Sequence, residues 1–367
     1  MVNVGMIGTS WWSNEMYMPA LATHPQAKVV AVAGRNPETT QAFAQQWSIP
    51  HAYTDWEDML AQEALEVLVV NTPNDAHFAM SMGAIERGIH VLCEKPLAFT
   101  YAQARTMADA AQRADVRTLV PFTYRFMPAF RYLKQLLEED YIGTPYMLNM
   151  RYYAGYARTA KYQWRFDLDV AGAGVVGDLG SHMLYLARWY YGEIVAVNAM
   201  LNCNVMRDLA PHGQPYQRGD DVALLQVQFA NGALGSIHVT SVAYEDTPRE
   251  QTHHVELHGS AGTLYSHTDW ATISNVRGAK QGEGYLKELP ITDAILQGAP
   301  SDDIQKQYRQ VFHEQDHMAR GFIRAIATGE SYDAPTFEDG AQVQAVIEAA
   351  LISAKERRQV QISEIVG

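Results

Sequence analysis

The sequence predicts an α/β N-terminal domain of the Rossmann type, a doubly wound parallel sheet, followed by an α+β C-terminal domain with an open, mostly antiparallel sheet. Three observations predict this architecture. The chain has 367 residues, which is too long for one ordinary core. Short apolar runs alternate with helical patterns up to residue 122. Beyond it, segments with alternating apolar and polar residues dominate. We therefore place the domains at 1–122 and 123–367.

Five apolar runs in the N-terminal part are typical of buried parallel strands, and helical patterns separate them. Two helix starts are marked by capping residues, Asn36 before Pro37 and Thr100 before the next helical pattern. This alternation predicts βαβ units, whose ligands bind at the carboxyl ends of the strands. The predicted strands are Val2–Ile7, Val29–Ala33, Val67–Val70, His90–Cys93 and Thr118–Val120.

The C-terminal part has the period of two that half-buried strands show, over 147–153, 225–229, 237–240 and 253–257. Asn231-Gly232 joins two of these segments and is a strong hairpin signal. Two long helical patterns, Ile304–Thr328 and Phe337–Arg358, end the chain. We expect helices on one face of this sheet.

Composition and charge exclude several classes of protein. Hydrophobic residues make up 47% and charged residues 19%, as in globular proteins. Lys plus Arg number 28 against 41 Asp plus Glu, so the net charge of -13 disfavours nucleic acid and anionic membranes as partners. The two cysteines, Cys93 and Cys203, are too few for a disulfide framework. No leader and no apolar run of roughly 18 residues is visible. We expect a cytoplasmic protein.

A degenerate dinucleotide-binding motif, Gly8–Ser13, follows the first strand. The motif requires a tight turn, a close approach to the pyrophosphate and close helix–strand packing. Gly8 suits the first of these, Ser10 the second and Ser13 the third, because both serines are small. We expect Gly8, Ser10, Trp11 and Trp12 to contact the cofactor. An ordinary strand-to-helix turn is the alternative.

The end of the second predicted strand bears on the choice between NADP and NAD. An acidic residue there would bind the ribose hydroxyls of NAD, but this chain has Arg35. A guanidinium can bind a 2′-phosphate through charge-assisted hydrogen bonds. NADP is therefore favoured. NAD stays possible, with Glu38 at the ribose and Arg35 on the surface.

Two motifs follow the third and fourth of these predicted strands, where doubly wound sheets bind ligands. The first runs from Asn71 through Thr72 and Pro73 to His77, and the second is Glu94-Lys95-Pro96. With them, the chain resembles the glucose-fructose oxidoreductase/inositol dehydrogenase family, often written Gfo/Idh/MocA. The resemblance extends over nearly the whole chain.

The resemblance implies roles for both motifs. Lys95 would be catalytic and would also contact the cofactor, Glu94 would contact its ribose, and the Lys95-Pro96 bond would be cis. A lysine beside a cationic nicotinamide ring binds its proton less tightly and can assist alcohol deprotonation. Taken alone, a lysine before proline is ordinarily a surface residue. The expected cofactor contacts of the first motif are Asn71, Thr72, Pro73 and His77.

The glycine-rich segment from Gly172 to His182 resembles the second catalytic element of the family. Helical spacing places Asp178, His182 and Tyr185 on one face. We expect His182 to accept the hydroxyl proton together with Lys95, and Asp178 to anchor the substrate. Where relatives often carry a second aspartate, this chain has Tyr185, which leaves the substrate open. A surface Asp–His pair is the alternative.

Two further elements are expected beside the cofactor by the same resemblance. Arg125 follows the last predicted strand of the first domain, and Trp164-Arg165 precede the glycine-rich segment. Each is equally consistent with packing plus a surface charge. Four further residues could contact substrate hydroxyls, and the sequence does not rank them: Arg151, Tyr156, Arg158 and Asp167.

The predicted function is an NAD(P)-dependent oxidoreductase that transfers hydride between nicotinamide and a secondary alcohol or ketone of a sugar, sugar derivative or polyol. A homodimer or homotetramer through the C-terminal sheet is expected by resemblance. Alternatives are a non-catalytic NAD(P)-binding regulator and an NAD-dependent glycosidase on the same fold.

A remote alternative is a zinc hydrolase. His313 and His317 fit His-Glu-x-x-His on a helix, with Glu314 as base and Glu338 as third ligand. The main prediction needs no metal. His253, His254 and His258 also suggest a metal site, but strand alternation separates the first from the other two.

Overall fold

The computed structural model describes residues 1–367, apart from the side chain of His212, and the chain folds into two compact units. The first unit consists of Met1–Pro121 and Tyr308–Gln342, and the second of Phe122–Gln307 and Val343–Gly367. The boundaries late in the chain fall within helices α11 (Ile304–His313) and α13 (Phe337–Glu356).

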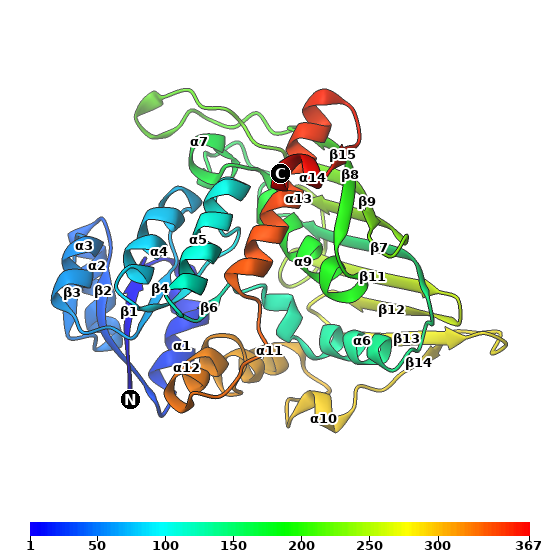
Figure 1. The fold of residues 1–367 in the computed structure, drawn as a ribbon, viewed down its shortest axis with the longest axis horizontal. Coiled ribbons are helices and arrows are strands. Elements are labelled where there is room, and N and C mark those ends of the chain that lie inside the picture. The colour runs from blue at the N-terminus through cyan, green and yellow to red at the C-terminus, as the bar shows by residue number, and fades with distance from the viewer. The chain divides into compact units, whose positions relative to one another are not determined.

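The first unit contains a six-stranded sheet with the strand order β3-β2-β1-β4-β5-β6 (Figure 1). All neighbouring strands are parallel, which confirms the predicted doubly wound sheet. The exposed edge strand β3 was not predicted, because it has no apolar run. The strands are β1 (Val2–Ile7), β2 (Ala27–Ala33), β3 (His51–Tyr53), β4 (Val67–Val70), β5 (His90–Cys93) and β6 (Thr118–Leu119).

Helices connect these strands, and both predicted caps are confirmed. The Asn36 side chain accepts a hydrogen bond from Thr39 N at 2.9 Å, and that of Thr100 from Gln103 N at 3.2 Å. The connecting helices are α1 (Met18–Ala22), α2 (Pro37–Trp47), α3 (Trp56–Gln62), α4 (His77–Ile85) and α5 (Tyr101–Arg113).

The late segment 308–342 packs with this first unit, although it follows the second unit's sheet in sequence. An Arg320 Nη1 hydrogen bond reaches the carbonyl oxygen of Ala20 at 2.9 Å. Val120 N donates to the carbonyl oxygen of Pro335, also at 2.9 Å. These contacts attach the segment to α1 and to the end of β6.

The expectation of one helix over 304–328 is wrong. Helix α11 ends at His313, and α12 (Met318–Thr328) begins only after a turn. Asp316, within that turn, pairs with His24 at 3.6 Å and with Arg324 at 3.3 Å. These side-chain contacts of Asp316 and the positive φ of 45° at Met318 accompany the break between the two helices. His313 and His317 therefore do not share a helix.

The second unit contains an open, mixed sheet with the order β14-β13-β12-β11-β7-β10-β9-β8-β15. Its neighbours are antiparallel except β7 and β10, a parallel pair that the sequence did not indicate. Asn231-Gly232 forms the predicted hairpin, with a φ of 88° at Gly232. The strands are β7 (Pro145–Ala154), β8 (Ile194–Asn202), β9 (Val222–Phe229), β10 (Leu234–Thr240), β11 (Gln251–Gly259), β12 (Gly262–Thr268), β13 (Asn275–Lys280), β14 (Lys287–Glu288) and β15 (Val360–Gln361).

Helices cover one face of this sheet, as predicted. Figure 1 shows α9 (Gly180–Tyr191) and the second half of α13 on the same side of the strands. Along β9, Ala223, Leu225 and Val227 are buried while the alternate side chains are exposed. The remaining helices of the second unit are α6 (Pro128–Glu138), α7 (Leu168–Ala171), α8 (Val175–Asp178), α10 (Asp293–Leu296) and α14 (Ser363–Val366).

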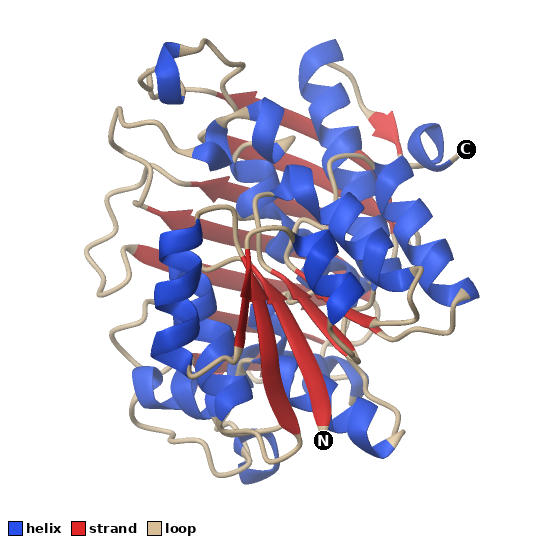
Figure 2. Ribbon diagram, turned by 90° about the vertical axis from the view of Figure 1, so that its left-hand side faces the viewer, coloured by secondary structure: helices blue, strands red, loops and turns tan.

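Figure 2 shows the strands as red arrows, with those of the first sheet converging towards their carboxyl ends. Within the described residues, none of the helices is long and apolar enough to cross a membrane. Cys93 and Cys203 are both free thiols. Burial raises the pKa of the Cys93 thiol well above its ordinary value.

Candidate active site

The turn after β1 requires glycine at position 8. Gly8 has a φ of 106°, and a Cβ there would lie 2.0 Å from the backbone oxygen of Asn71. Such a distance is far below van der Waals contact, so the two strand ends approach as closely as backbone atoms permit. Ser13 Oγ donates to the carbonyl oxygen of Gly8 at 2.8 Å and fixes the turn.

A cluster of neutral polar side chains joins the ends of β1 and β4. The Asn71 amide donates to Ser10 Oγ at 3.0 Å and to Ser13 Oγ at 2.6 Å. Asn71 and Ser13 are buried. This polar cluster of Ser10, Ser13 and Asn71 therefore supports the turn after β1, at the edge of the sheet where doubly wound folds bind ligands.

The helix after the turn begins at Trp11 and contains a π-helical segment, Ser13–Tyr17. Such segments occur frequently at functional sites. Trp11 is 66% exposed, whereas Trp12 is partly buried and donates from Nε1 to Glu94 Oε1 at 2.6 Å. The two predicted cofactor contacts thus differ: Trp11 offers an open ring face, and Trp12 is hydrogen-bonded to the end of β5.

The Glu94 carboxylate is buried and accepts hydrogen bonds on both oxygens. Besides Trp12, the Tyr17 hydroxyl donates to Oε1 at 2.5 Å, and Lys95 N donates to Oε2 at 3.1 Å. Burial raises the pKa of Glu94, while Lys95 and these hydrogen bonds lower it. Glu94 therefore fixes the backbone from which the Lys95 side chain extends.

His77 connects the loops that follow β4 and β5. Its Nδ1 lies 3.0 Å from the carbonyl oxygen of Pro96, and its Nε2 lies 3.1 Å from that of Thr72. The side chain has no exposed surface, and burial lowers its pKa. Because it is enclosed, His77 positions the Lys95-Pro96 peptide, which is cis. Thr72 and Pro73 are partly exposed on the same loop.

The segment after β2 presents Arg35 to solvent. Glu38, the alternative ribose contact, is also exposed in the first turn of α2. Asn36 caps that helix, so Arg35 occupies the last position before it. Both the arginine and the carboxylate can therefore reach a ligand at this strand end.

In the second unit, Asp178 ends α8 and His182 lies in the first turn of α9. The two side chains are one helical turn apart, as predicted. His182 is 6% exposed and packs edge-on against Tyr124, with ring centroids 4.9 Å apart. The Phe122 ring also packs edge-on against the imidazole, with ring centroids 6.2 Å apart. An aromatic surface therefore fixes the imidazole.

The Asp178 carboxylate interacts with Tyr156 and Arg165. The Tyr156 hydroxyl donates to Asp178 Oδ2 at 2.5 Å, and Arg165 Nε lies 3.5 Å from the same oxygen. Desolvation of the hydroxyl group, followed by the Asp178 charge, raises the pKa of Tyr156 well above its usual range although 38% of the residue is exposed, so the phenol stays a donor. Arg165 also lies over the Trp164 ring, with 4.7 Å to its centroid.

Arg125, expected beside the cofactor, is only 7% exposed. It donates to the Tyr185 hydroxyl and lies over the Trp189 ring at 4.8 Å. Tyr185, at the position where the resemblance suggests a second aspartate, stacks on Phe122 at 4.5 Å. Tyr185 therefore packs the aromatic surface beneath His182 and binds Arg125.

The four unranked hydroxyl contacts have different environments. Tyr156 binds Asp178, as described, whereas Arg158 pairs with Glu250 at 3.1 Å. Asp167 caps α7, accepting from Asp169 N at 3.0 Å. Arg151 lies on the helix-free face of the sheet, paired in register with His238 and His254. Tyr156 is therefore the one of these four that the described contacts bring to Asp178.

Sequence reasoning missed Asp220, which contacts the start of α8. Its carboxylate accepts from Gly174 N at 3.1 Å and from Val176 N at 2.9 Å. Desolvation raises the pKa of this carboxyl to about 6. The sequence held one signal, a Gly219-Asp220-Asp221 run just before a strand with one buried face.

The residues of the zinc-hydrolase alternative are engaged elsewhere. His313 Nε2 lies 2.9 Å from the carbonyl oxygen of Glu15. Glu338, the suggested third ligand, pairs with Arg105 at 2.5 Å. Since the two histidines do not share a helix either, the hydrolase motif lacks its required geometry. His253 is buried on one face of β11, and His254 and His258 lie on the other.

The fold and these elements define a dinucleotide-binding oxidoreductase with a separate α/β unit, and family comparison gives the same class. Residues 2–122 match the Gfo/Idh/MocA oxidoreductase family, NAD-binding Rossmann fold. Residues 134–362 match the C-terminal alpha/beta domain of that family. The chain therefore belongs to the Gfo/Idh/MocA family of oxidoreductases and is an enzyme that binds NAD(P).

Individual relatives agree. The levoglucosan dehydrogenase of Pseudarthrobacter phenanthrenivorans is 28% identical over 99% of both chains. A solved levoglucosan dehydrogenase, in complex with NADH and levoglucosan, superposes with a TM-score of 0.86 at 27% identity, covering 98% of this chain and 99% of the other. The D-xylose 1-dehydrogenase [NADP(+)] of Haloarcula marismortui is 29% identical over 51% of this chain and 54% of its own length.

Proposed function

We propose that the protein is an NAD(P)-dependent dehydrogenase that oxidises a secondary hydroxyl of a sugar, sugar derivative or polyol, or reduces the matching ketone. The observation that carries this proposal is the placement of Asp178 and His182 on successive helical turns after a glycine-rich segment. Similarity to the levoglucosan and xylose dehydrogenases supports a carbohydrate substrate.

The residues present fit a dinucleotide in the first unit. The close approach at Gly8 and the polar cluster beneath it suit a pyrophosphate at the start of the helix. Trp11 and Thr72 offer accessible side chains at the same sheet edge. The bound nicotinamide would supply the hydride acceptor or donor.

The second unit supplies groups for the proton and the hydroxyls. The His182 imidazole accepts the proton of the reacting hydroxyl, and its packing on Tyr124 and Phe122 fixes its orientation. Asp178 accepts hydrogen bonds from substrate hydroxyls and is oriented by Tyr156. Lys95 is assigned a share of the proton transfer by its motif.

The variants Lys95→Ala and His182→Ala test these assignments. Each should lower kcat by about two orders of magnitude or more, because general acid–base groups contribute about that much. The NADPH dissociation constant should stay nearly constant. Lys28→Ala and His267→Ala, at exposed positions, serve as matched controls. Wild-type turnover by both active-site variants would refute the assignments.

Nicotinamide absorbance, followed with levoglucosan, D-xylose and myo-inositol, tests the reaction class. A dehydrogenase consumes the cofactor in proportion to product. A regulator binds it without turnover, and a glycosidase releases sugar without net reduction. No change in absorbance with any member of a broad sugar panel would overturn the proposal.

We propose NADP as the favoured cofactor, since exposed Arg35 follows β2 where a carboxylate would select NAD. The solved levoglucosan dehydrogenase contains NADH, so the question is open to experiment within this family. Arg35→Ala should lower kcat/KM with NADP about tenfold or more and leave the value with NAD nearly constant. A wild-type preference for NAD would refute this choice.

We further propose a homodimer or homotetramer formed through the helix-free face of the second sheet. That face carries exposed apolar side chains, among them Met200, Leu224 and Leu234. Light scattering should give a multiple of the 41.0 kDa chain mass. A monomer at micromolar concentration would contradict it.

A further inference from the structure

Two consecutive aspartates, Asp220 and Asp221, precede β9 and are both buried. Buried carboxylates are costly unless each is fully hydrogen-bonded or paired. The two side chains meet this requirement in different ways. This difference separates a residue of general structural importance from one that acts on the catalytic segment.

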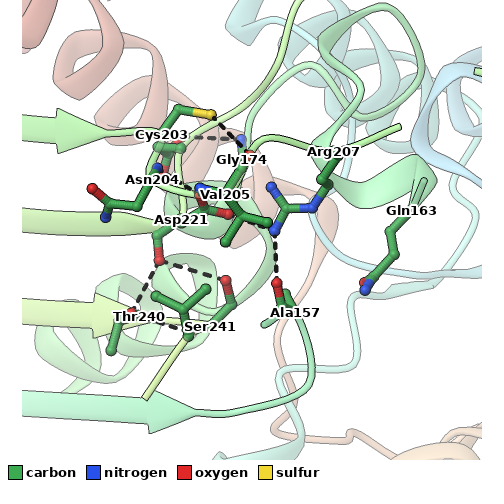
Figure 3. Close-up of polar contacts among 12 residues, drawn as sticks. Ala157, Gln163, Gly174, Cys203, Asn204, Val205, Arg207, Asp221, Thr240 and Ser241 are labelled. Carbon is green, nitrogen blue, oxygen red and sulfur yellow. Dashed lines mark hydrogen bonds and ion pairs between the residues drawn. The ribbon is translucent and has the colours of Figure 1, made fainter. Parts of the chain in front are cut away.

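Asp221 stabilises the loop that follows β8, as Figure 3 shows. It accepts from Asn204 N and Val205 N, both at 2.7 Å, and pairs with Arg207 at 2.5 Å. Arg207 in turn donates to the carbonyl oxygen of Ala157 at 3.0 Å. Asp221 is therefore compensated by a buried cation and contacts neither α8 nor α9 in these bonds.

Asp220 binds the glycine-rich segment instead. Its two carboxylate oxygens accept from Gly174 N and Val176 N, and its own carbonyl oxygen accepts from Val175 N at 2.8 Å. Three successive backbone N–H groups of this segment therefore donate to one residue. A helix leaves its first N–H groups without intrahelical partners, and Asp220 satisfies those at the start of α8.

The same segment continues directly into the catalytic helix turns. Gly174 O accepts from Gly177 N at 3.1 Å and from Asp178 N at 3.0 Å. Asp220 therefore binds Gly174, and Gly174 in turn binds the backbone of Asp178. A Cβ at Gly174 would lie 2.3 Å from Asp220 N, so the two backbones are in close contact.

We propose that Asp220 is a positioning residue for the reaction: by binding the N–H groups of 174–176 it sets the location of Asp178 and His182. The inference rests on the proposed function of those two residues. Both carboxylate oxygens of Asp220 bind backbone N–H groups, so the role we assign to it is positioning and not proton transfer. Catalysis is sensitive to such positioning, because a misplacement of about 1 Å can cost about a hundredfold in rate.

The test compares Asp220→Ala and Asp220→Asn with a matched control in the full-length protein. Asp220→Asn keeps one acceptor oxygen but turns an NH₂ group towards an N–H donor, so its effect should be smaller. The control is Ser353→Ala, which also removes a buried polar group of the second unit. Ser353 accepts from Ala199 N at 2.9 Å, on β8.

Two readouts distinguish positioning from general destabilisation. Amide hydrogen exchange over 172–182 should accelerate about tenfold or more in Asp220→Ala and stay at the wild-type rate in Ser353→Ala. With a sugar that the wild type oxidises, kcat should fall about a hundredfold in Asp220→Ala and about tenfold in Asp220→Asn. NADPH affinity should be the same in all variants, and Ser353→Ala should lose thermal stability without losing kcat.

The outcomes separate this inference from the proposed function. Unchanged exchange over 172–182 in both Asp220 variants, or unchanged kcat, overturns the positioning role. Absence of wild-type turnover with every sugar overturns the proposed function, and exchange then decides alone whether Asp220 fixes the segment. If Asp220→Ala fails to fold, Asp220→Asn supplies both readouts.

Discussion

Two turns, Gly8–Ser13 in the first unit and the glycine-rich segment from Gly172 in the second, each lead into a helix that carries candidate functional residues, and their supporting groups have opposite chemistry. Gly8 approaches the backbone of Asn71, and Gly174 that of Asp220, so neither turn has room for a Cβ. Beneath Gly8, the supporting groups are the neutral hydroxyls and amide of Ser10, Ser13 and Asn71. Beneath Gly174, the support is the Asp220 carboxylate.

The difference follows from the ligand that each helix start can accept. A pyrophosphate needs the N–H groups and the positive dipole end at the start of a helix, and a carboxylate at that place would compete with it. Neutral side chains support the first turn without occupying that position. At the second turn, the groups proposed to act on the ligand are side chains. Its backbone N–H groups are therefore available to the Asp220 carboxylate of the protein itself.

The largest effect is expected at the buried ion pair of Arg207 and Asp221, which follows directly on Asp220 in the sequence. Asp221→Asn should lower the free energy of unfolding by about 3–5 kcal/mol, because it leaves the Arg207 guanidinium buried without its counter-charge. Urea unfolding followed by circular dichroism measures this. A loss below about 1 kcal/mol, the scale of a neutral hydrogen bond, would contradict the importance of this buried ion pair and would leave Asp220 as the more important of the two aspartates.

The pH dependence of stability should differ between the turns. The pKa of Asp220 is raised from 3.8 to about 6 in the fold. The folded protein therefore binds this proton more tightly than the unfolded chain, and stability falls as pH rises from about 4 to about 6, then levels. The contribution is about 3 kcal/mol at 1.36 kcal/mol per pKa unit.

Unfolding of the wild type and of Asp220→Asn at several pH values measures that contribution. The variant has no titrating group at this position. Its stability should therefore increase relative to that of the wild type as pH rises from about 4 to about 6. Ser13→Ala, in the neutral cluster, should show a difference from wild type that is independent of pH. A constant difference for Asp220→Asn as well would show that its carboxyl titrates normally.

Gly8→Ala should affect the first turn alone. The positive φ of Gly8 and the contact with Asn71 make the substitution cost about 1–3 kcal/mol of strain. NADPH affinity, measured by fluorescence titration, should fall about tenfold or more, because about 1.4 kcal/mol of binding free energy corresponds to a factor of ten. Gly88→Ala is a useful control, since its φ is also positive but its surroundings are open. Equal affinity in the two variants would contradict the close approach.

The smallest effect is expected for Ser13→Ala. It removes the hydrogen bond to Gly8 O and one acceptor of the Asn71 amide, each worth about 1 kcal/mol. Chemical denaturation should therefore show a loss of about 1–2 kcal/mol, with NADPH affinity reduced only a few fold. A loss of about 3 kcal/mol or more would contradict the view that the polar cluster supports its turn through ordinary neutral hydrogen bonds.

Local sequence signals predicted most of the fold. Strands with continuous apolar runs, the caps at Asn36 and Thr100, and the Asn231-Gly232 hairpin are each determined by neighbouring residues. The exposed strand β3 and the parallel pairing of β7 with β10 lack such signals, because edge burial and strand order depend on distant parts of the chain.

The candidate site shows the same limit. Motifs identified Lys95, Asp178 and His182 as candidates, and nothing near them in sequence pointed to Asp220, which lies well downstream of α8. Likewise, the break after His313 arises from the contacts of Asp316 with His24 and Arg324. Contacts between distant residues are therefore what periodicity and short motifs leave out.

The attachment of 308–342 to the first unit has a consequence for biosynthesis. Chains emerge from the ribosome N-terminus first, and domains ordinarily fold in that order. Here the nucleotide-binding unit lacks α12 and its contacts with Ala20 until strands β7 to β14 of the second sheet have been translated. The unit whose synthesis starts first is thus completed only after most of the second sheet. A nascent chain that ends within the second sheet therefore exposes a first unit that lacks residues 308–342.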